Sequence, residues 1–393
     1  TIRAMEGDLI KTRDWLSPLS WLYGLAVSLR NWLFNVGLLH QQSYDIPVIA
    51  VGNITVGGTG KTPHVEYLVR LLHKLTKVAV LSRGYKRRSK GYVLADDSST
   101  ALTIGDEPYQ MTRKFKDIYV AVDANRREGI ARLTTDESTN DVGVILLDDA
   151  FQHRYVKPGI NILLVDYHRL IIYDKLLPAG RLREPLSGKR RADFVIVTKC
   201  PADLKPMDIR VLTKAMGLYP YQELFFTTME YGELYPLFEG SNDEPPKLKG
   251  HNVLMLTGIA SPEEMESDIK TKCRSLTTMT FRDHHVFTPK DIEAISDAFA
   301  QMDSPKIIVT TEKDSTRLLQ AKLTDAIKSA LYVLPIQVRF MLNQDEELFN
   351  NKIISYVRKN SRNSILAKGK NARTANDRNN FGHRTGTISF RDN

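Results

Sequence analysis

One segment near the start of the chain constrains its fold more than any other feature. The apolar run 48–51 has the composition of a buried parallel strand, and a glycine-rich turn and the triplet Gly60-Lys61-Thr62 follow it. A helical pattern then begins at Pro63, which suits a first helical turn because the N–H that proline lacks would be unpaired there. A strand, a glycine loop, a Lys-Thr pair and a helix in this order predict a phosphate-binding loop for a nucleoside triphosphate.

Each part of this segment has a chemical use. Glycines let backbone N–H groups approach phosphate oxygens, Lys61 adds a full positive charge, and the Thr62 hydroxyl is placed to hold Mg²⁺. The strict pattern has glycine at position 55, where this chain has Thr55, so a turn that only packs a strand against a helix is the alternative. The residues predicted to bind the phosphates are Thr55, Val56, Gly57, Gly58, Thr59, Gly60, Lys61 and Thr62.

Length, cysteines and charge limit the class of protein. A chain of 393 residues is long enough for two or three domains, and its 2 cysteines exclude a disulfide framework and indicate a reducing compartment. The net charge of +9 is concentrated at the end of the chain, where residues 359–393 are basic and poor in apolar side chains. We expect this tail to be disordered. An anionic membrane surface is one alternative partner for it, and nucleic acid is not expected, because no aromatic residues are interleaved with the basic ones.

Residues 15–39 predict a helix that is apolar on nearly every side. Small or polar residues recur at spacings of three and four, so they form one narrow stripe. The uncharged run from Leu16 to Leu29 is shorter than the ~20 residues that span a bilayer, and its aromatic residues favour the lipid–water boundary. We therefore predict an amphipathic helix on a membrane surface, with burial against the protein's own core or in a dimer as the alternative. The stripe consists of Ser17, Ser20, Gly24, Ser28, Asn31 and Asn35.

The apolar runs along the chain predict an α/β fold. Runs that alternate with helical patterns predict a parallel sheet of the phosphate-loop NTPase type with helices on both faces, and the change of texture after about residue 225 predicts a smaller second α/β domain. The predicted division is a membrane-associating helix in 1–45, a phosphate-loop domain in 46–225, a second domain in 226–358 and the tail in 359–393. The predicted strands are 47–51, 77–81, 118–122, 143–147, 160–165, 193–197, 252–257, 306–310 and 331–334.

Acidic residues stand at two places where parallel strands and helices would meet. The strand-like run 144–147 ends in Asp148 and Asp149, and adjacent carboxylates at a strand end are costly unless a cation neutralises them. This favours a metal site, with a helix cap or a turn as the alternative. Asp106 and Glu107 precede another helix, where they either cap it or serve as a base and a metal ligand.

Histidine and arginine residues add further candidates. The loop 282–287 contains His284 and His285 after an aspartate, which suggests a metal site or a tuned base, while a surface histidine is the alternative. Three glycine- or proline-punctuated loops carry Arg83, Arg126 and Arg183, and arginine in such loops grips phosphate through paired N–H groups. For the stretch 311–314, Thr-Glu-Lys-Asp, a helix cap or an interdomain salt bridge is expected.

Together these motifs resemble the tetraacyldisaccharide 4′-kinase family of the lipid A pathway. The resemblance runs from about residue 12 to 318 and rests on GNITVGGTGKTP, LSRGY, GDEP, DDAFQHR, LPAGRLREP, DHHVF and TEKD, in that order. It implies an ATP- and Mg²⁺-dependent enzyme that transfers the γ-phosphate of ATP to the 4′-hydroxyl of tetraacyldisaccharide 1-phosphate, giving lipid IVA. It also implies a peripheral or monotopic protein on the cytoplasmic face of the bacterial inner membrane, with no obligate protein partner.

The resemblance assigns roles to individual residues. It implies that Lys61 contacts the transferring phosphate, that Asp106 is the general base for the sugar hydroxyl, and that His284 pairs with this base across the two domains. The implied metal ligands are Thr62, Asp148, Glu107 and Asp149. The implied contacts with substrate or phosphate are Arg83, Tyr85, Arg126, Gln152, His153 and Arg183.

The chain departs from the family pattern at three positions. Ala150 stands where glycine is usual, Arg181 where proline is usual, and His64 where a small or apolar residue is usual. Two other function classes remain as alternatives at this stage. A GTPase-like switch is poorly supported because Pro201 stands where a guanine-reading aspartate belongs, and a nucleic-acid-binding ATPase rests only on the basic tail.

Overall fold

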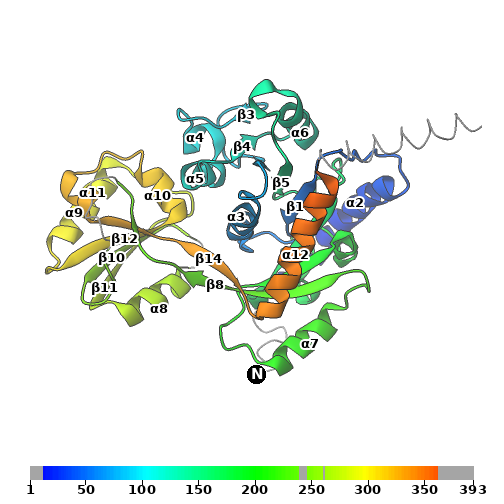
Figure 1. Cartoon of the computed structure of the whole chain (residues 1–393). Helices are drawn as coiled ribbons and strands as arrows, with labels where there is room; N and C mark the ends of the chain where they lie inside the picture. The colour runs from blue at the N-terminus through cyan, green and yellow to red at the C-terminus, as the bar shows by residue number, and fades with distance from the viewer. Residues whose placement is uncertain (1–11, 239–245, 260–261, 362–393) are drawn as a thin grey trace, which may run out of the picture.

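The computed structural model describes residues 12–238, 246–259 and 262–361, and within these ranges the strands form two sheets. The larger described sheet has nine strands in the order β14-β8-β7-β6-β1-β5-β2-β4-β3, and the smaller has five in the order β11-β10-β12-β13-β9. We call the parts built on these sheets the first unit and the second unit. Figure 1 shows them as separate bodies, with β8 and β14 running from one toward the other.

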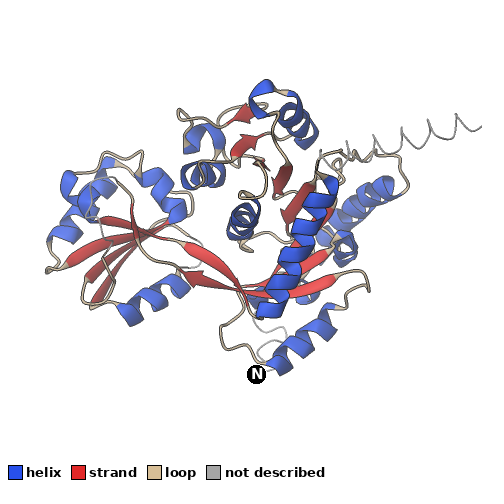
Figure 2. Cartoon of the chain, in the orientation of Figure 1, coloured by secondary structure: helices blue, strands red, loops and turns tan. Residues whose placement is uncertain are grey.

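The secondary structure alternates between strands and helices in both units (Figure 2). The strands of the first unit are β1 (Val48–Gly52), β2 (Val78–Ser82), β3 (Val93–Leu94), β4 (Tyr119–Val122), β5 (Val144–Asp148), β6 (Ile160–Asp166), β7 (Phe194–Thr198), β8 (Glu223–Tyr231) and β14 (Ile336–Phe340). The strands of the second unit are β9 (Tyr235–Pro236), β10 (Asn252–Thr257), β11 (Ser275–Thr280), β12 (Lys306–Thr311) and β13 (Leu331–Leu334).

The helices fill most of the connections between these strands. The α-helices are α2 (Ser17–Asn35), α3 (Lys61–Leu72), α4 (Ala101–Ile104), α5 (Asp106–Lys114), α6 (Arg126–Thr135), α7 (Pro206–Met216), α8 (Glu263–Lys272), α9 (Pro289–Ala300), α10 (Glu312–Leu318), α11 (Asp325–Ala330) and α12 (Asn343–Asn360). The 3₁₀ helices are η1 (Asp14–Leu16), η2 (Glu137–Thr139), η3 (Tyr167–Arg169), η4 (Ile171–Tyr173) and η5 (Leu186–Arg191).

The predicted α/β fold with helices on both faces of a mainly parallel sheet is confirmed. β1, the central strand, pairs in parallel with β5 and β6, and its alternate side chains enter cores on opposite faces. On one face the sheet packs against α3, α5 and α12, and on the other against α6 and α7. The strands β1, β2 and β5 read as continuous apolar runs because both of their faces are buried.

The domain division drawn from the sequence stays a prediction, but the structure shows how the chain passes between the units. β8 begins before the predicted boundary at 225 and runs through it. After the second unit, β14 pairs antiparallel with β8, and α12 places Phe349 and Ile353 in the core of the first unit. The chain therefore crosses between the units twice, and two paired strands join them.

The helix α2 lies on the first unit with its polar stripe partly turned inward. Ser20 and Gly24 are buried, and the Ser20 hydroxyl donates to the Leu176 carbonyl oxygen at 3.0 Å. Of the stripe's other members, Ser28 and Asn35 are exposed. The opposite side is apolar and open to solvent, with Trp21 74% exposed and Leu25 59% exposed.

Two features of the chain bear on membranes and on the predicted tail. None of the helices in the described ranges has the length and apolarity needed to cross a bilayer. The predicted disordered tail lies mostly outside the described residues, because α12 ends at Asn360 and the description stops at Ser361.

Candidate active site

The phosphate-binding loop is open where a phosphate would enter it. Gly57 and Gly60 have φ of 126° and 79°, a left-handed backbone that glycine adopts without strain. Gly60 at the N-cap of α3 has no side chain to cap the helix, and the N–H groups of a first helical turn can bind an anion. The loop is held from behind, because the Asn53 amide donates to the Thr59 hydroxyl at 2.9 Å and the Thr198 hydroxyl donates to the Thr59 carbonyl at 3.0 Å.

The departure at position 64 has a structural explanation. His64 is buried behind the loop, where one ring nitrogen lies 2.7 Å from the Gly60 carbonyl and the other lies 3.1 Å from the Thr227 hydroxyl of β8. Burial lowers the pKa of His64 to about 4, so the ring is neutral at pH 7. This histidine therefore ties the loop to the strand that leads to the second unit.

The departures at 55, 150 and 181 are also accommodated. Thr55 forms a β-bridge with Leu182, and the Val56 N–H donates to the Arg181 carbonyl at 2.8 Å. Arg181 is exposed, and its guanidinium extends toward Gly57 of the loop. Ala150 is buried without a left-handed backbone, so the chain does not need glycine there.

The two aspartates at the end of β5 have different surroundings. Asp148 is 5% exposed, and one of its carboxylate oxygens accepts from the Ser82 hydroxyl at 3.2 Å while the other has no hydrogen-bond partner among the described residues. Burial and the neighbouring charges of Asp149 and Glu107 raise the pKa of Asp148 to about 6. Asp149 has a left-handed backbone, with φ of 46°, and is paired at 3.7 Å with Lys61 and at 3.3 Å with Arg183.

Lys61, Arg183, Asp148 and Asp149 therefore bring two positive and two negative charges together beside the phosphate loop. A buried carboxylate with an unpaired oxygen and a raised pKa fits a divalent cation, because the cation's charge would compensate the surrounding acids. Within the described ranges, no three or more His, Cys, Asp or Glu side chains are grouped so that they could hold a metal ion by themselves.

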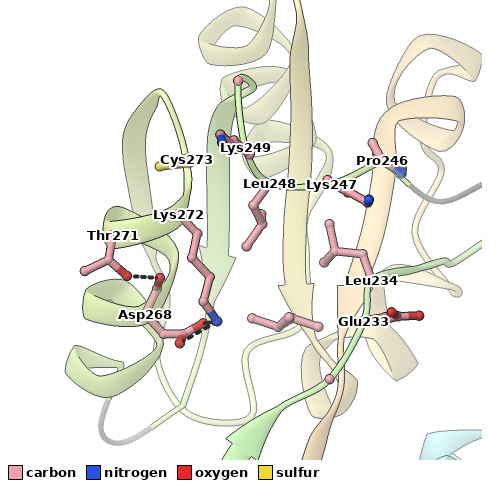
Figure 3. Close-up of a pocket in the computed structure, with 13 residues that line it drawn as sticks. Glu233, Leu234, Pro246, Lys247, Leu248, Lys249, Asp268, Thr271, Lys272 and Cys273 are labelled. Carbon is pink, nitrogen blue, oxygen red and sulfur yellow. Dashed lines mark hydrogen bonds and ion pairs between the residues drawn. The ribbon is translucent and has the colours of Figure 1, made fainter.

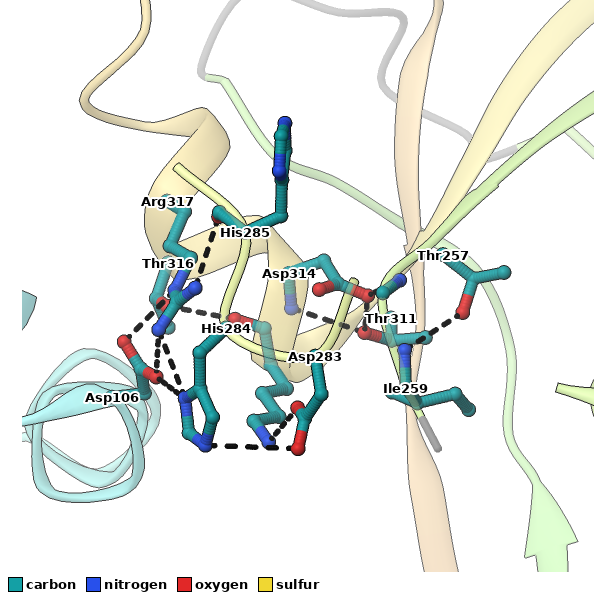
Figure 4. A network of polar contacts seen from close by, with 12 residues as sticks. Asp106, Thr257, Ile259, Asp283, His284, His285, Thr311, Asp314, Thr316 and Arg317 are labelled. Carbon is teal, nitrogen blue, oxygen red and sulfur yellow. Dashed lines mark hydrogen bonds and ion pairs between the residues drawn. The ribbon is translucent and has the colours of Figure 1, made fainter. Parts of the chain in front are cut away.

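A second cluster lies where α5 of the first unit meets the second unit (Figure 4). Asp106, the first residue of α5, is 6% exposed, and one of its carboxylate oxygens lies 2.7 Å from Nδ1 of His284. The Arg317 guanidinium of α10 grips the same carboxylate through two nitrogens, with Nε donating to Oδ1 at 3.1 Å. Burial alone would raise the pKa of Asp106, but the hydrogen bonds from His284 and Arg317 hold it below its ordinary value.

His284 is held in a strained position. Its φ of 65° lies in the left-handed region, where a non-glycine residue is uncommon and often functional. Nδ1 faces Asp106, and Nε2 lies 3.8 Å from Asp283, which is itself paired with Lys313 at 2.7 Å. Since the ionised carboxylate of Asp106 can only accept, the contact is a hydrogen bond donated by the Nδ1–H of His284.

A cavity of about 330 Å³ opens beside this cluster. Tyr85 lines it with Asp106 and His284, and its ring centre lies 5.6 Å from that of the histidine. The apolar residues Leu102 and Val286 also line it and are 42% and 67% exposed. The cavity therefore combines a polar cluster with apolar side chains.

The three arginines predicted to contact substrate or phosphate differ in burial and in their partners. Arg83 is exposed, and Arg183 reaches Asp149. Arg126 is 2% exposed and donates to the Asp148 carbonyl at 3.2 Å, and burial lowers its pKa to about 10, so it supports the loop that carries the acids.

Gln152 and His153 lie in the turn that follows the two aspartates. The Gln152 amide donates to the Asn53 carbonyl at 2.7 Å and to Glu184 at 2.9 Å, which ties this turn to the strand–loop junction. Burial and nearby arginines lower the pKa of His153 to about 4, so this ring is neutral at pH 7. Gln152 therefore lies beside the strand end that leads into the phosphate loop.

Arg317 is the residue of this site that the sequence interpretation missed. It follows the Thr-Glu-Lys-Asp stretch by three positions, and no spacing in the chain indicates that it reaches Asp106, 211 residues away. The expectation for that stretch is confirmed in both forms. The Thr311 hydroxyl accepts from the Asp314 N–H at 3.0 Å and caps α10, and Glu312 pairs with Lys114 of the first unit.

Another cavity, of about 890 Å³, lies in the second unit near α8 (Figure 3). Leu234 and Leu248 line it beside the ion pair between Lys272 and Asp268, which measures 2.8 Å. Its described lining contains none of the residues predicted for the site, so size alone does not identify the active site here.

Comparison with known proteins agrees with this geometry. A model of the family described as tetraacyldisaccharide-1-P 4′-kinase matches residues 12–357. A tetraacyldisaccharide 4′-kinase of Phocaeicola vulgatus is 57% identical over 364 residues, which cover 92% of this chain and 99% of that protein. The enzyme of the same name from Bacteroides thetaiotaomicron is 50% identical over 379 residues, covering 94% and 99% of the two chains.

A solved structure extends the likeness to three dimensions. The crystal structure of LpxK from Aquifex aeolicus in complex with ATP has a TM-score of 0.64 and 28% sequence identity to this chain, covering 88% of it and 99% of LpxK. The range matched by the family model, 12–357, includes residues of both units. The chain belongs to the tetraacyldisaccharide-1-P 4′-kinase family.

Proposed function

We propose that this chain transfers the γ-phosphate of ATP to the 4′-hydroxyl of tetraacyldisaccharide 1-phosphate, a lipid A precursor, with Mg²⁺ bound at Asp148. One observation carries the proposal. The charges of Lys61 and Glu107 both act on the pKa of the buried Asp148, and Asp106 directly precedes Glu107 in α5, which supports one site for the phosphate loop, Asp148 and the Asp106 cluster.

The residues divide the work of phosphoryl transfer between them. Such a transfer asks the protein mainly to position the reactants and to stabilise charge. Lys61 and the N–H groups at the start of α3 bind the phosphates, and Arg183 lies beside them to stabilise charge on the transferring group. The Thr62 hydroxyl, Asp148 and Glu107 would hold Mg²⁺, which supplies positive charge to the phosphate oxygens when it is bound.

Asp106 is the residue proposed to take the proton of the 4′-hydroxyl. Its lowered pKa makes it a weak base, which suits a transfer whose transition state is loose and in which the hydroxyl proton leaves late. His284 keeps the carboxylate oriented by donating from Nδ1. Because these residues belong to different units, closing the units on each other completes the site.

We also propose that α2 holds the enzyme on the cytoplasmic face of the bacterial inner membrane. The outer side of α2 exposes Trp21, Leu22, Leu25, Leu29 and Trp32, as a helix lying in a lipid–water boundary would. The inner side contacts the catalytic loops, since the Tyr23 hydroxyl donates to the Arg183 carbonyl at 2.7 Å and Arg30 donates to the Gln152 carbonyl at 3.1 Å. A lipid held at this surface would lie close to the phosphate loop.

The test is direct transfer of label. Purified protein in detergent is incubated with γ-labelled ATP, Mg²⁺ and tetraacyldisaccharide 1-phosphate, and the label in the lipid is measured. We expect labelled lipid with the wild type and none above background with Lys61→Ala. Hydrolysis of ATP without labelling of the lipid would refute the proposed acceptor.

A further inference from the structure

Two short helices from different units lie antiparallel, and opposite charges pair at both ends of their contact. At one end, Asp106 begins α5 and pairs with Arg317 near the end of α10. At the other end, Lys114 ends α5 and pairs with Glu312, which begins α10. Each charge also has the sign that the dipole of its own helix favours, with the acids at the N-termini and the bases at the C-termini.

The far end of this contact is buried and reaches a third helix. Lys114 also pairs at 2.6 Å with Glu66 of α3, whose side chain is 1% exposed, whereas the Lys114 side chain is 19% exposed. Gln110 of α5 donates to the other Glu66 oxygen at 2.8 Å. Since α3 begins with Lys61, this cluster joins the phosphate-binding helix to α5 and α10.

Buried charges arranged in this way define geometry more than they add stability. The attraction within a buried ion pair is largely offset by the loss of hydration, so such pairs seldom stabilise a fold more than apolar contacts would. Burial and the charge of Glu312 raise the pKa of Glu66, so the two carboxylates also repel each other. A cluster that gains little in stability but fixes three helices in one register is suited to positioning.

We propose that α5 and α10 form a charge-paired clamp that sets the approach of the second unit, and that Lys114 and Glu312 are positioning residues for phosphoryl transfer. The proposal rests on the proposed function, because it requires the Asp106 cluster to be the site of proton transfer. Lys114 lies eight residues along α5 from Asp106, which is about 12 Å at 1.5 Å per residue. It therefore acts on the reaction only through the helices.

The near end shows what the clamp positions. Arg317 donates to the His285 carbonyl at 2.9 Å and lies 3.0 Å from Nδ1 of His284, so the position of α10 decides where the His284 loop meets Asp106. If the Lys114–Glu312 pair were lost, α10 would be free to tilt, and a tilt that moved Arg317 would shift this loop. Displacement of reacting groups by about 1 Å lowers rates by up to about 100-fold.

The primary test is Glu312→Gln. This variant removes the interdomain charge, leaves the pair of Lys114 with Glu66 in place, and retains an oxygen to accept from the Ile336 N–H. It also removes the repulsion of Glu66, so we expect the protein to fold. Label transfer to the lipid is measured together with the Kd for ATP and hydrogen exchange of the α5 and α10 amides.

We expect kcat to fall by about 10- to 100-fold with the Kd for ATP unchanged within about twofold, and the α5 and α10 amides to exchange at least about fivefold faster. Lys114→Met should behave in the same way, and Lys114→Arg should recover most of the activity because it restores the charge. Glu128→Gln is the matched control, since it breaks the exposed pair with Arg132 on α6, and it should leave both readouts unchanged.

The clamp proposal would be refuted if both Glu312→Gln and Lys114→Met kept the wild-type kcat and the wild-type hydrogen exchange of the α5 and α10 amides. If Asp106→Asn is inactive at the same time, the proposed function stands without the clamp. A wild-type enzyme that does not label the lipid refutes the proposed function instead, and the exchange measurement still decides whether the clamp exists.

Discussion

The exposed apolar side of α2 makes a quantitative prediction about membrane binding. Leu22, Leu25 and Leu29 lie on one side of the helix and are 59%, 59% and 55% exposed. Complete burial of a leucine side chain is worth about 1.5–3 kcal/mol, so moving slightly more than half of each into lipid contributes about 1 kcal/mol. Replacing all three with glutamine should therefore cost about 3 kcal/mol, which weakens binding roughly 100-fold.

The assay is co-sedimentation with vesicles of phosphatidylcholine and phosphatidylglycerol. The matched control replaces three exposed apolar residues away from α2, Leu75, Met207 and Leu348, with glutamine as well. This control should bind vesicles like the wild type. If the α2 variant binds as tightly as the control, the apolar side of α2 is not the membrane-binding surface and the reasoning is wrong.

Three further predictions follow from single residues. Asp148→Asn should lower kcat at least about 100-fold and raise the Mg²⁺ concentration needed for half-maximal transfer, because it removes the charge of the proposed ligand; an unchanged Mg²⁺ titration would exclude that role. Arg181→Ala should raise the KM for ATP about threefold to tenfold if its guanidinium contacts phosphate, with kcat nearly unchanged, whereas an identical KM assigns it no such contact. His64 should make the free energy of unfolding sensitive to acid. Its pKa of about 4 in the folded state lies below its pKa in the unfolded state, so the unfolded state binds more protons between these values. The free energy of unfolding therefore falls as the pH drops from about 6.5 to 4. His64→Gln should lose less stability than the wild type over this window in urea unfolding, and parallel curves would contradict the assignment.

The sequence predicts the sheet of the first unit well because burial on both faces leaves a clear pattern. The runs 47–51, 77–81 and 143–147 appear as β1, β2 and β5 with shifts of about one residue. The pattern fails for β8 and β14, whose antiparallel pairing depends on a return of the chain from the second unit. The helix α12 is not among the elements predicted from the sequence, although Phe349, Ile353 and Val357 recur every four residues, as in a helix with one buried face.

The candidate site was predictable only in part. The phosphate loop and the acids that end β5 follow from local patterns, because each motif is contiguous in the sequence. The pair of Asp106 and His284 spans 178 residues and came from the family resemblance, since spacing alone left both with ordinary alternatives. Arg317 and the Lys114–Glu312 pair depend on how two helices from different units meet, which no local pattern reports.

The central claim is that the acceptor hydroxyl is activated at Asp106, in a site completed by the second unit. The most direct measurement is the single-turnover rate of label transfer to tetraacyldisaccharide 1-phosphate by Asp106→Asn, with ATP affinity and thermal unfolding measured on the same preparation. We predict a rate about 10²- to 10⁴-fold below that of the wild type, with ATP affinity unchanged, because the variant keeps the shape of the side chain but loses the base and its charge pairing with Arg317. A folded variant that transfers phosphate at the wild-type rate would contradict the claim.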